Sequence, residues 1–442
     1  MASDLQVLVD HLAEQVGASA VLEDQRQRTV AHSCQVGPID TLRRDSILDR
    51  ATPPELVEWF HSFGILQARA PLAIPAHEEF GILPRLCAPV RYRDHLLGFL
   101  WVIDNDGTVS EQHLQAIEKA AGHAAVLLYE DELAQRLSCH ALSQLLSPSE
   151  ELRSGAAQQI VDQALLPDGQ PTVIVVVQPL ACSEPSDDFS LAIKEVLADV
   201  GLGAPPGAVL RLACSDHGVL LVGLRSCTDD AFAFHLATGA RRALVHRLRS
   251  SLTQPVRAVA SIGDPQEHLA QAVASYRQAR LAVKVAGAIP ATGDVVRWSE
   301  LGVFRALAQL PTKEAQESAV DPRLLSLLDA GDETVISTLE TFLDLAGDIK
   351  ATAEALHLHR GTLYYRLEKA ERLSGLDIHN GYDRLSAHLG LKLARLAGHR
   401  VTVPTVSNAP RASAALHKRP AKKDAGPQAR AEAWKPSARP GG

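Results

Sequence analysis

The densest group of side chains that could do chemistry lies between residues 359 and 372. It combines guanidinium, ammonium, hydroxyl and imidazole groups, which donate hydrogen bonds to phosphate oxygens and to base edges. Its polar members are His359, Arg360, Thr362, Tyr364, Tyr365, Arg366, Lys369 and Arg372. This set of donors suits the binding of double-stranded DNA.

Patterns typical of catalysis or of metal binding are absent from the chain. It contains no Gly-x-x-x-x-Gly-Lys-Ser/Thr, Gly-x-Ser-x-Gly or His-Glu-x-x-His sequence. The six cysteines form no Cys-x-x-Cys pair, and His357 and His359, two residues apart, would point to different sides. We therefore expect no enzyme activity, no catalytic residue, no metal site and no cofactor, with the cysteines reduced.

The donor group lies on the second of two helices that the spacing predicts. Asp348 is expected to cap a helix over 349–356, and a three-residue turn leads to a second helix that ends at Gly375. Ala353 is small where the two helices would cross. This is helix-turn-helix geometry, although any helical hairpin shows similar apolar spacing. The buried stripe of the second helix is Leu363, Leu367 and Ala370.

At about 100° per residue, the helical angle of each other side chain predicts where it lies relative to the buried stripe. Gly361, Tyr365 and Arg372 point away from the stripe. Thr362 and Lys369 lie on one flank, where we expect them to bind phosphate, and Tyr364 lies on the other. Arg366 falls at the edge of the stripe, where it would pair with a neighbouring helix or a flanking phosphate. Arg360 lies in the first turn, from which a long side chain reaches the major groove.

The sequence from His359 to Leu367, His-Arg-Gly-Thr-Leu-Tyr-Tyr-Arg-Leu, resembles the His-Arg-Asn-Thr-Leu-x-x-Arg-Leu signature of the PucR/CdaR family of bacterial transcription regulators. The resemblance covers about residues 335–397. Gly361 stands for the usual Asn, a difference that bears on base preference and not on the fold. The turn and second helix also resemble Fis-type helix-turn-helix proteins, which implies that Arg360 reads a base. We expect this base to be guanine, and Tyr365 to touch a base or sugar.

Two upstream segments resemble other domains of such regulators. Ser261-Ile-Gly-Asp264 and the following apolar pattern are similar to a GGDEF-like domain. A cyclase needs a Gly-Gly-Asp/Glu-Glu-Phe turn with two metal-binding carboxylates, which the turn Ser215–Gly218 lacks. Residues 97–104, before a long helix, resemble a GAF-type sensor domain. Trp101 on this strand could line a ligand pocket, but core packing is favoured.

Hydrophobic periodicity predicts the remaining elements. We expect Ser3 to cap the first helix, and the long helix from Ser110 to about Leu146 to pair protomers through a heptad-like stripe. Polar linkers are expected over Pro148–Gly155 and about Pro311–Pro322. The predicted strands are 19–22, 29–34, 86–91, 96–103, 172–177, 208–214, 218–224 and 256–262. The predicted helices are 5–16, 39–48, 54–63, 110–146, 191–200, 231–252, 265–285, 335–343, 349–356, 360–374 and 382–396.

The expected fold class is multidomain: two α+β domains, a helix-turn-helix domain and a disordered basic tail. Residues 401–442 carry a net charge of +6, against −14 for the rest, which favours a nucleic-acid partner. The expected domains are 1–130, GAF-like; 131–157, connecting helix and linker; 158–310, degenerate GGDEF-like; 323–398, helix-turn-helix; and 399–442, tail.

These features predict a ligand-responsive transcription regulator in the cytoplasm, associated with the nucleoid when bound to DNA. No membrane helix or signal peptide is expected. We expect a homodimer or higher oligomer, because one recognition helix reads too few base pairs. Two alternatives stay open at this point: a nucleotide-binding signalling protein that uses the GGDEF-like domain, and a protein-interaction scaffold. The effector and its pocket are not identified by the sequence.

Overall fold

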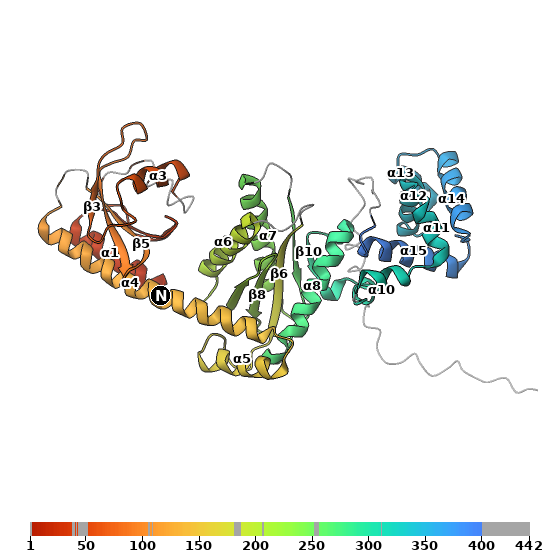
Figure 1. Cartoon of the computed structure of the whole chain (residues 1–442), viewed down its shortest axis with the longest axis horizontal. Coiled ribbons are helices and arrows are strands. Elements are labelled where there is room, and N and C mark those ends of the chain that lie inside the picture. Colours follow the sequence, from red (N-terminus) through yellow and green to blue (C-terminus); the bar gives the residue numbers. More distant parts are fainter. Residues whose placement is uncertain are drawn as a thin grey trace, which may run out of the picture. The chain divides into compact units, whose positions relative to one another are not determined.

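The computed structural model describes residues 2–399, apart from 38–39, 41, 43–51, 105–106, 108, 181–186, 206, 252–255 and 311. The chain divides into two compact units, Met1–Ala308 and Gln309–Gly442, and each is described by itself. The first unit holds two α+β domains and the second is helical (Figure 1). This confirms the expected fold class. The predicted helix over 39–48 and the predicted tail fall mainly outside the described residues.

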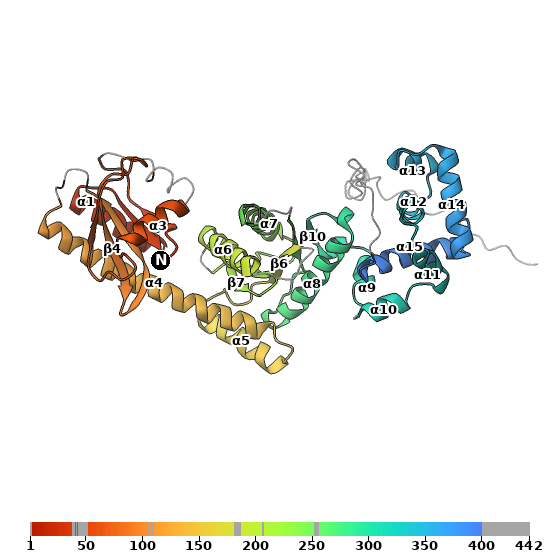
Figure 2. The same cartoon turned by 45° about the horizontal axis from the view of Figure 1, so that its top comes forward.

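A five-stranded antiparallel sheet forms the N-terminal domain, in the order β2-β1-β5-β4-β3. Successive residues of a strand face opposite sides, so each side of the sheet has its own core. Leu22 and Leu100 pack with α1 and α4 on one side, whereas Val21 and Trp101 pack with α3 on the other (Figure 2). The elements are α1 (Ala2–Val16), β1 (Ala20–Asp24), β2 (Thr29–His32), α3 (Pro54–Ser62), β3 (Leu72–Ile74), β4 (Arg85–Tyr92), β5 (His95–Ile103) and α4 (Glu111–Leu145).

The predicted hairpin over 86–103 is confirmed, but two expectations for this domain were wrong. Helix α1 begins at Ala2, so Ser3 lies within the helix and not at the position before it. The stripe on α4 does not face a second protomer. Its residues Ile117 and Ala124 are fully buried in the core that α1 and the sheet of the same chain form.

The middle domain is a mixed sheet in the order β10-β9-β6-β8-β7, in which only β10 and β9 run parallel. Helices α6 and α7 cover one face through the apolar side chains of β6, β8 and β9. Helix α8 covers the other face. It lies so close to Gly263 that a Cβ added to this glycine would overlap the carbonyl oxygen of Ser275. The elements are α5 (Glu150–Asp162), β6 (Thr172–Leu180), α6 (Asp187–Gly203), β7 (Val209–Ala213), β8 (Gly218–Gly223), α7 (Ala231–Ser251), β9 (Arg257–Ile262), η1 (Leu269–Gln271), α8 (Ala272–Ala288), η2 (Pro290–Thr292), β10 (Val295–Arg297), η3 (Trp298–Glu300) and α9 (Phe304–Leu307).

The βαββαβα order predicted for this domain is confirmed, with two differences. Pro148–Gly155 is not a linker, because Ser149 accepts a hydrogen bond from the Leu152 N–H and caps α5. Its polar residues form the exposed side of a helix that buries Ala156 and Ile160. Helix α8 begins later than predicted, at Ala272, because a 3-10 turn precedes it.

The second unit contains helices only, within the residues that the structure describes. Thr312 caps α10, so the linker predicted near 311–322 was wrong. In this described part and in the first unit alike, no helix is both long and apolar enough to cross a bilayer. The helices are α10 (Lys313–Ser318), α11 (Pro322–Asp329), α12 (Glu333–Asp344), α13 (Ile349–Ala355), α14 (Arg360–Ser374) and α15 (Gly381–Leu396).

Candidate nucleic-acid interface

Helices α13 and α14 and the turn between them form a helix-turn-helix (Figure 2). Asp348 caps α13 as predicted, accepting hydrogen bonds from the N–H groups of Lys350 and Ala351 at 2.8 and 3.0 Å. The chain then turns through His357, which has a φ of +52°. His359 caps α14, with Nδ1 3.2 Å from the Gly361 N–H. These caps fix where each helix begins, and therefore which side chains reach the first turn of α14.

The two sides of α14 differ in burial as the helical spacing predicts. Leu363 and Ala370 are fully buried and Leu367 nearly so, and they hold α14 against the other helices of the unit. Tyr365 is 60% exposed and Tyr364 57% exposed, which is unusual for aromatic side chains with no partner to cover them. The other exposed predicted contacts on or beside this helix are His359, Arg360, Gly361, Thr362 and Arg372.

Two of the predicted DNA contacts are half-buried and paired with α12. Arg366 donates a hydrogen bond to Thr338 Oγ1 at 3.3 Å. Lys369 Nζ lies 2.6 Å from Oδ2 of Asp332, the residue that caps α12. Hydrogen bonds from Lys369 and Thr334 lower the pKa of Asp332 to about 2, so the carboxylate stays ionised near neutral pH. Lys369 would have to share or leave this carboxylate to bind a phosphate.

Gly361 is exposed near the start of α14, and its surroundings leave room for a side chain. A Cβ built there would meet His359 Nδ1 at 3.4 Å, an ordinary van der Waals contact, and no backbone atom. The glycine is therefore not required for close packing. A larger residue at this position could point outward from the same helix.

A buried ion cluster holds α12 against α15 behind the helix-turn-helix. The Glu340 carboxylate accepts hydrogen bonds from Lys392 Nζ at 2.8 Å and from Arg395 Nε at 2.6 Å. All three side chains are at most 9% exposed. Sequence reasoning missed this cluster because Glu340 lies more than 50 residues from both of its basic partners.

The β7–β8 turn, where a cyclase would hold its metal, carries one carboxylate and that group is engaged by other side chains. Asp216 lies 2.6 Å from His217 Nδ1 and 3.1 Å from Arg280 Nη2. The other ring nitrogen of His217 lies 3.0 Å from the Tyr276 hydroxyl. Burial lowers the pKa of His217 despite Asp216, which favours the neutral imidazole. The turn thus has a local structural network in place of a carboxylate pair.

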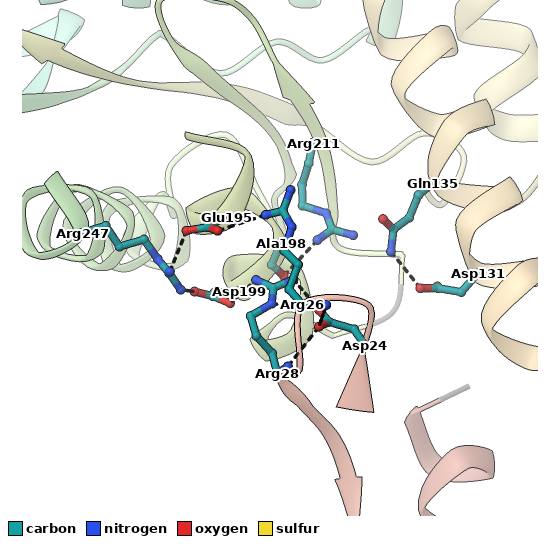
Figure 3. A network of polar contacts seen from close by, with 10 residues as sticks. All are labelled: Asp24, Arg26, Arg28, Asp131, Gln135, Glu195, Ala198, Asp199, Arg211 and Arg247. Carbon is teal, nitrogen blue, oxygen red and sulfur yellow. Dashed lines mark hydrogen bonds and ion pairs between the residues drawn. The ribbon is translucent and has the colours of Figure 1, made fainter. Parts of the chain in front are cut away.

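A second polar network joins the N-terminal and middle domains within the first unit (Figure 3). Arg26, in the turn after β1, donates to Glu195 Oε1 on α6 at 3.0 Å, and Arg28 lies 3.5 Å from Asp199. Arg247 on α7 holds both acids, at 2.8 Å from Glu195 and 2.6 Å from Asp199. The turn between β1 and β2 therefore contacts the same carboxylates that link two helices of the middle domain.

Comparison with known proteins identifies two of the domains. A model of the PucR C-terminal helix-turn-helix domain matches residues 335–393, and a model of the GGDEF-like domain matches residues 153–285. The first match contains all the predicted DNA contacts, from His359 to Arg372.

Three curated relatives from Bacillus subtilis (strain 168) are transcriptional or regulatory proteins. The Proline-responsive transcriptional activator PutR is 21% identical over 411 residues, covering 89% of this chain and 97% of its own. The DNA-binding transcriptional activator AdeR is 20% identical over 413 residues, covering 89% and 93%. The Purine catabolism regulatory protein is 35% identical over 65 residues, covering 15% and 12%. Two relatives thus match this chain across nearly their whole length.

Proposed function

We propose that the chain is a transcription regulator of the PucR type, that it binds double-stranded DNA through α14 and that a small-molecule effector controls this binding. The observation that carries the first part is the two-sided burial of α14. Its apolar stripe is covered, while Arg360, Thr362, Tyr365 and Arg372 are exposed on a helix that a capped turn holds in place. Exposed donors on a rigid helix are what base reading in the major groove needs.

Each side chain has its own role in this proposal. Arg360 reads guanine through its two-pronged guanidinium, and Tyr365 touches a base or sugar. Thr362 and Lys369 bind phosphate. Arg366 holds α14 to α12 through Thr338, or reaches a flanking phosphate from that position.

The effector response is assigned to the N-terminal domain, which we interpret as a GAF-like sensor. The printed description of one relative as proline-responsive supports control by a small molecule. The protein acts in the cytoplasm, on the nucleoid when DNA-bound, and as a homodimer or higher oligomer, since one α14 covers too few base pairs for useful specificity. Both matched full-length relatives are described as activators, which favours activation.

The middle domain is proposed to transmit the signal without catalysis. The single carboxylate of its β7–β8 turn is held by His217 and Arg280. Incubation of the full chain with GTP and Mg²⁺ should yield no cyclic dinucleotide, and the appearance of that product would overturn this assignment.

Selection of bound fragments from the genome of origin tests the proposed function. The purified full chain should enrich a common sequence with repeated half-sites, and an Arg360→Ala variant should lose that enrichment. Arg69→Ala, an exposed arginine of the N-terminal domain, is the matched control and should behave as wild type. If no sequence is enriched even at low salt, the proposal fails.

A further inference from the structure

The N-terminal domain encloses a small polar cavity on the side of its sheet that α3 covers. The cavity volume is about 20 Å³, room for about one water molecule. Polar groups from three strands and a loop reach it, among them Glu23, Arg85, Trp101 and Thr52, and Phe60 of α3 closes it. A cavity with this lining in an otherwise apolar core is not explained by packing.

Glu23 is the central group of this cavity. It is 5% exposed, and its Oε2 accepts a hydrogen bond from the Trp101 indole N–H at 2.7 Å. Thr52 Oγ1 lies 3.4 Å from Oε1, which is a long contact. A carboxylate has about four acceptor positions, so two hydrogen bonds leave part of this capacity unused.

Among the described residues, the Glu23 carboxylate is hydrogen-bonded by Trp101 and Thr52, neither of which is a cation. The charge of Arg85 lowers the pKa of Glu23, but the Arg85 guanidinium is bonded to Asp40 and to the Leu83 carbonyl. Burying an ion without a partner is costly, so the site favours either a proton or a second cation at Glu23.

An aromatic wall lies beside the carboxylate. The rings of Phe60 and Trp101 are 4.6 Å apart between centroids, and Trp101 also donates to Glu23. A carboxylate next to aromatic rings is the combination that recognises small organic cations.

We propose that this cavity is the effector site and that it binds a small molecule through a protonated amine, with Glu23 as counter-ion. This rests on the proposed function, since it names the class of effector. The present volume is too small for an alkylammonium ion, so binding moves α3, which carries Phe60, outward from the sheet.

The position of Glu23 also explains how ligand binding in the cavity affects the middle domain. The next residue, Asp24, accepts hydrogen bonds from the backbone N–H groups of Arg26 and Arg28 and so shapes the turn after β1. These two arginines contact Glu195 and Asp199 of α6 (Figure 3). One peptide bond thus separates the counter-ion from the network between the domains.

Isothermal titration calorimetry on the full chain without DNA tests the site, with ethylammonium chloride as probe and acetamide and sodium acetate as neutral and anionic controls. Ethylammonium should bind, and Glu23→Gln should abolish binding while preserving an acceptor for Trp101. Glu58→Gln, the same change at an exposed position on α3, should have no effect.

The pH dependence gives a second measurement on the wild-type chain. The groups that face Glu23 are Asp24 on its own strand, Arg85 and Cys87 on β4, and Asp40. Burial raises the pKa of Glu23 to about 7, and an amine binds the ionised form, so affinity should be about tenfold lower at pH 6 than at pH 8.

Three results would overturn the proposal: no ethylammonium binding, binding retained in Glu23→Gln, or equal binding of acetamide. Because DNA is absent from this experiment, failure here leaves the DNA-binding proposal standing. Loss of fragment enrichment would in turn leave the amine site standing.

Discussion

Neutralising Glu340 should loosen the helices that support α14. Glu340→Gln keeps the size of the side chain but leaves Lys392 and Arg395 without a carboxylate that both now contact. Breaking a buried ion pair costs about 3–5 kcal/mol. The lower value, about 3 kcal/mol, is expected, because Lys392 keeps Asp344 at 2.8 Å. This corresponds to a roughly 150-fold larger open population of α12 and α15.

Hydrogen exchange of the full chain, read by mass spectrometry, measures this change. No tryptophan lies between residues 309 and 399, so intrinsic tryptophan fluorescence would not report on these helices. Amides of α12 and α15 should exchange about 150-fold faster, with peptides of β6 unchanged.

Asp344→Asn is the matched control. This carboxylate contacts the same lysine, but its side chain is 45% exposed, so the expected cost is below about 1 kcal/mol. Less than a tenfold increase for Glu340→Gln, or a larger effect of Asp344→Asn, would refute the reasoning.

Three further predictions concern the tail, the domain contact and the cavity. Truncation after Gly398 removes the tail, whose residues 401–442 carry a net charge of +6. The magnitude of the slope of the logarithm of DNA affinity against the logarithm of salt concentration should fall by up to about 5, with the preferred DNA sequence unchanged. A new consensus sequence would contradict this prediction. The side chains of Arg26 and Glu195 are 46% and 20% exposed, so their interaction should be weak. A double-mutant cycle on the free energy of unfolding should give a coupling energy of only roughly 0.2–1 kcal/mol. A coupling energy above about 2 kcal/mol would instead show a fixed interface. Burial raises the pKa of Glu23 from 4.5 to about 7, so the folded form binds its proton more tightly than the unfolded form, and stability is lost as pH rises through 7. In urea unfolding without ligand, followed by tryptophan fluorescence, Glu23→Gln should remove roughly 2 kcal/mol of destabilisation between pH 5 and pH 8. An unchanged pH profile in this variant would disprove the prediction.

Local spacing was enough to predict the helix-turn-helix. The stripe Leu363, Leu367 and Ala370 is buried, and Gly375 ends α14 in the left-handed conformation, as the spacing and the glycine indicate. Strands β3 and β10 could not be predicted in the same way. Each has three residues, too few for an alternating pattern, and each is held by a neighbouring strand.

Polar residues led to wrong predictions at three places. The segments around Glu150 and Lys313 are polar, but capped helices begin there, because exposed helices need few apolar residues. The predicted strand over 19–22 stops before Glu23, although β1 includes Glu23 and the side chain is buried in the core. A charged residue next to an apolar strand was the available signal.

Contacts between distant residues were beyond reach of any spacing argument. Asp332 and Lys369 are 37 residues apart, and Arg366 and Thr338 are 28 apart. These pairs decide which side chains of α14 are free for DNA, and only the packing of α12 against α14 brings them together.

The ratio of specific to random DNA affinity in two arginine variants tests the central claim most directly. Arg360 is exposed in the first turn of α14, whereas Arg366 is half-buried and bonded to α12. Arg360→Ala should lower the specific affinity by about 5- to 150-fold, a loss of roughly 1–3 kcal/mol, and affect random DNA far less. If that ratio survives Arg360→Ala but collapses in a folded Arg366→Ala variant, α14 does not read DNA in the way described.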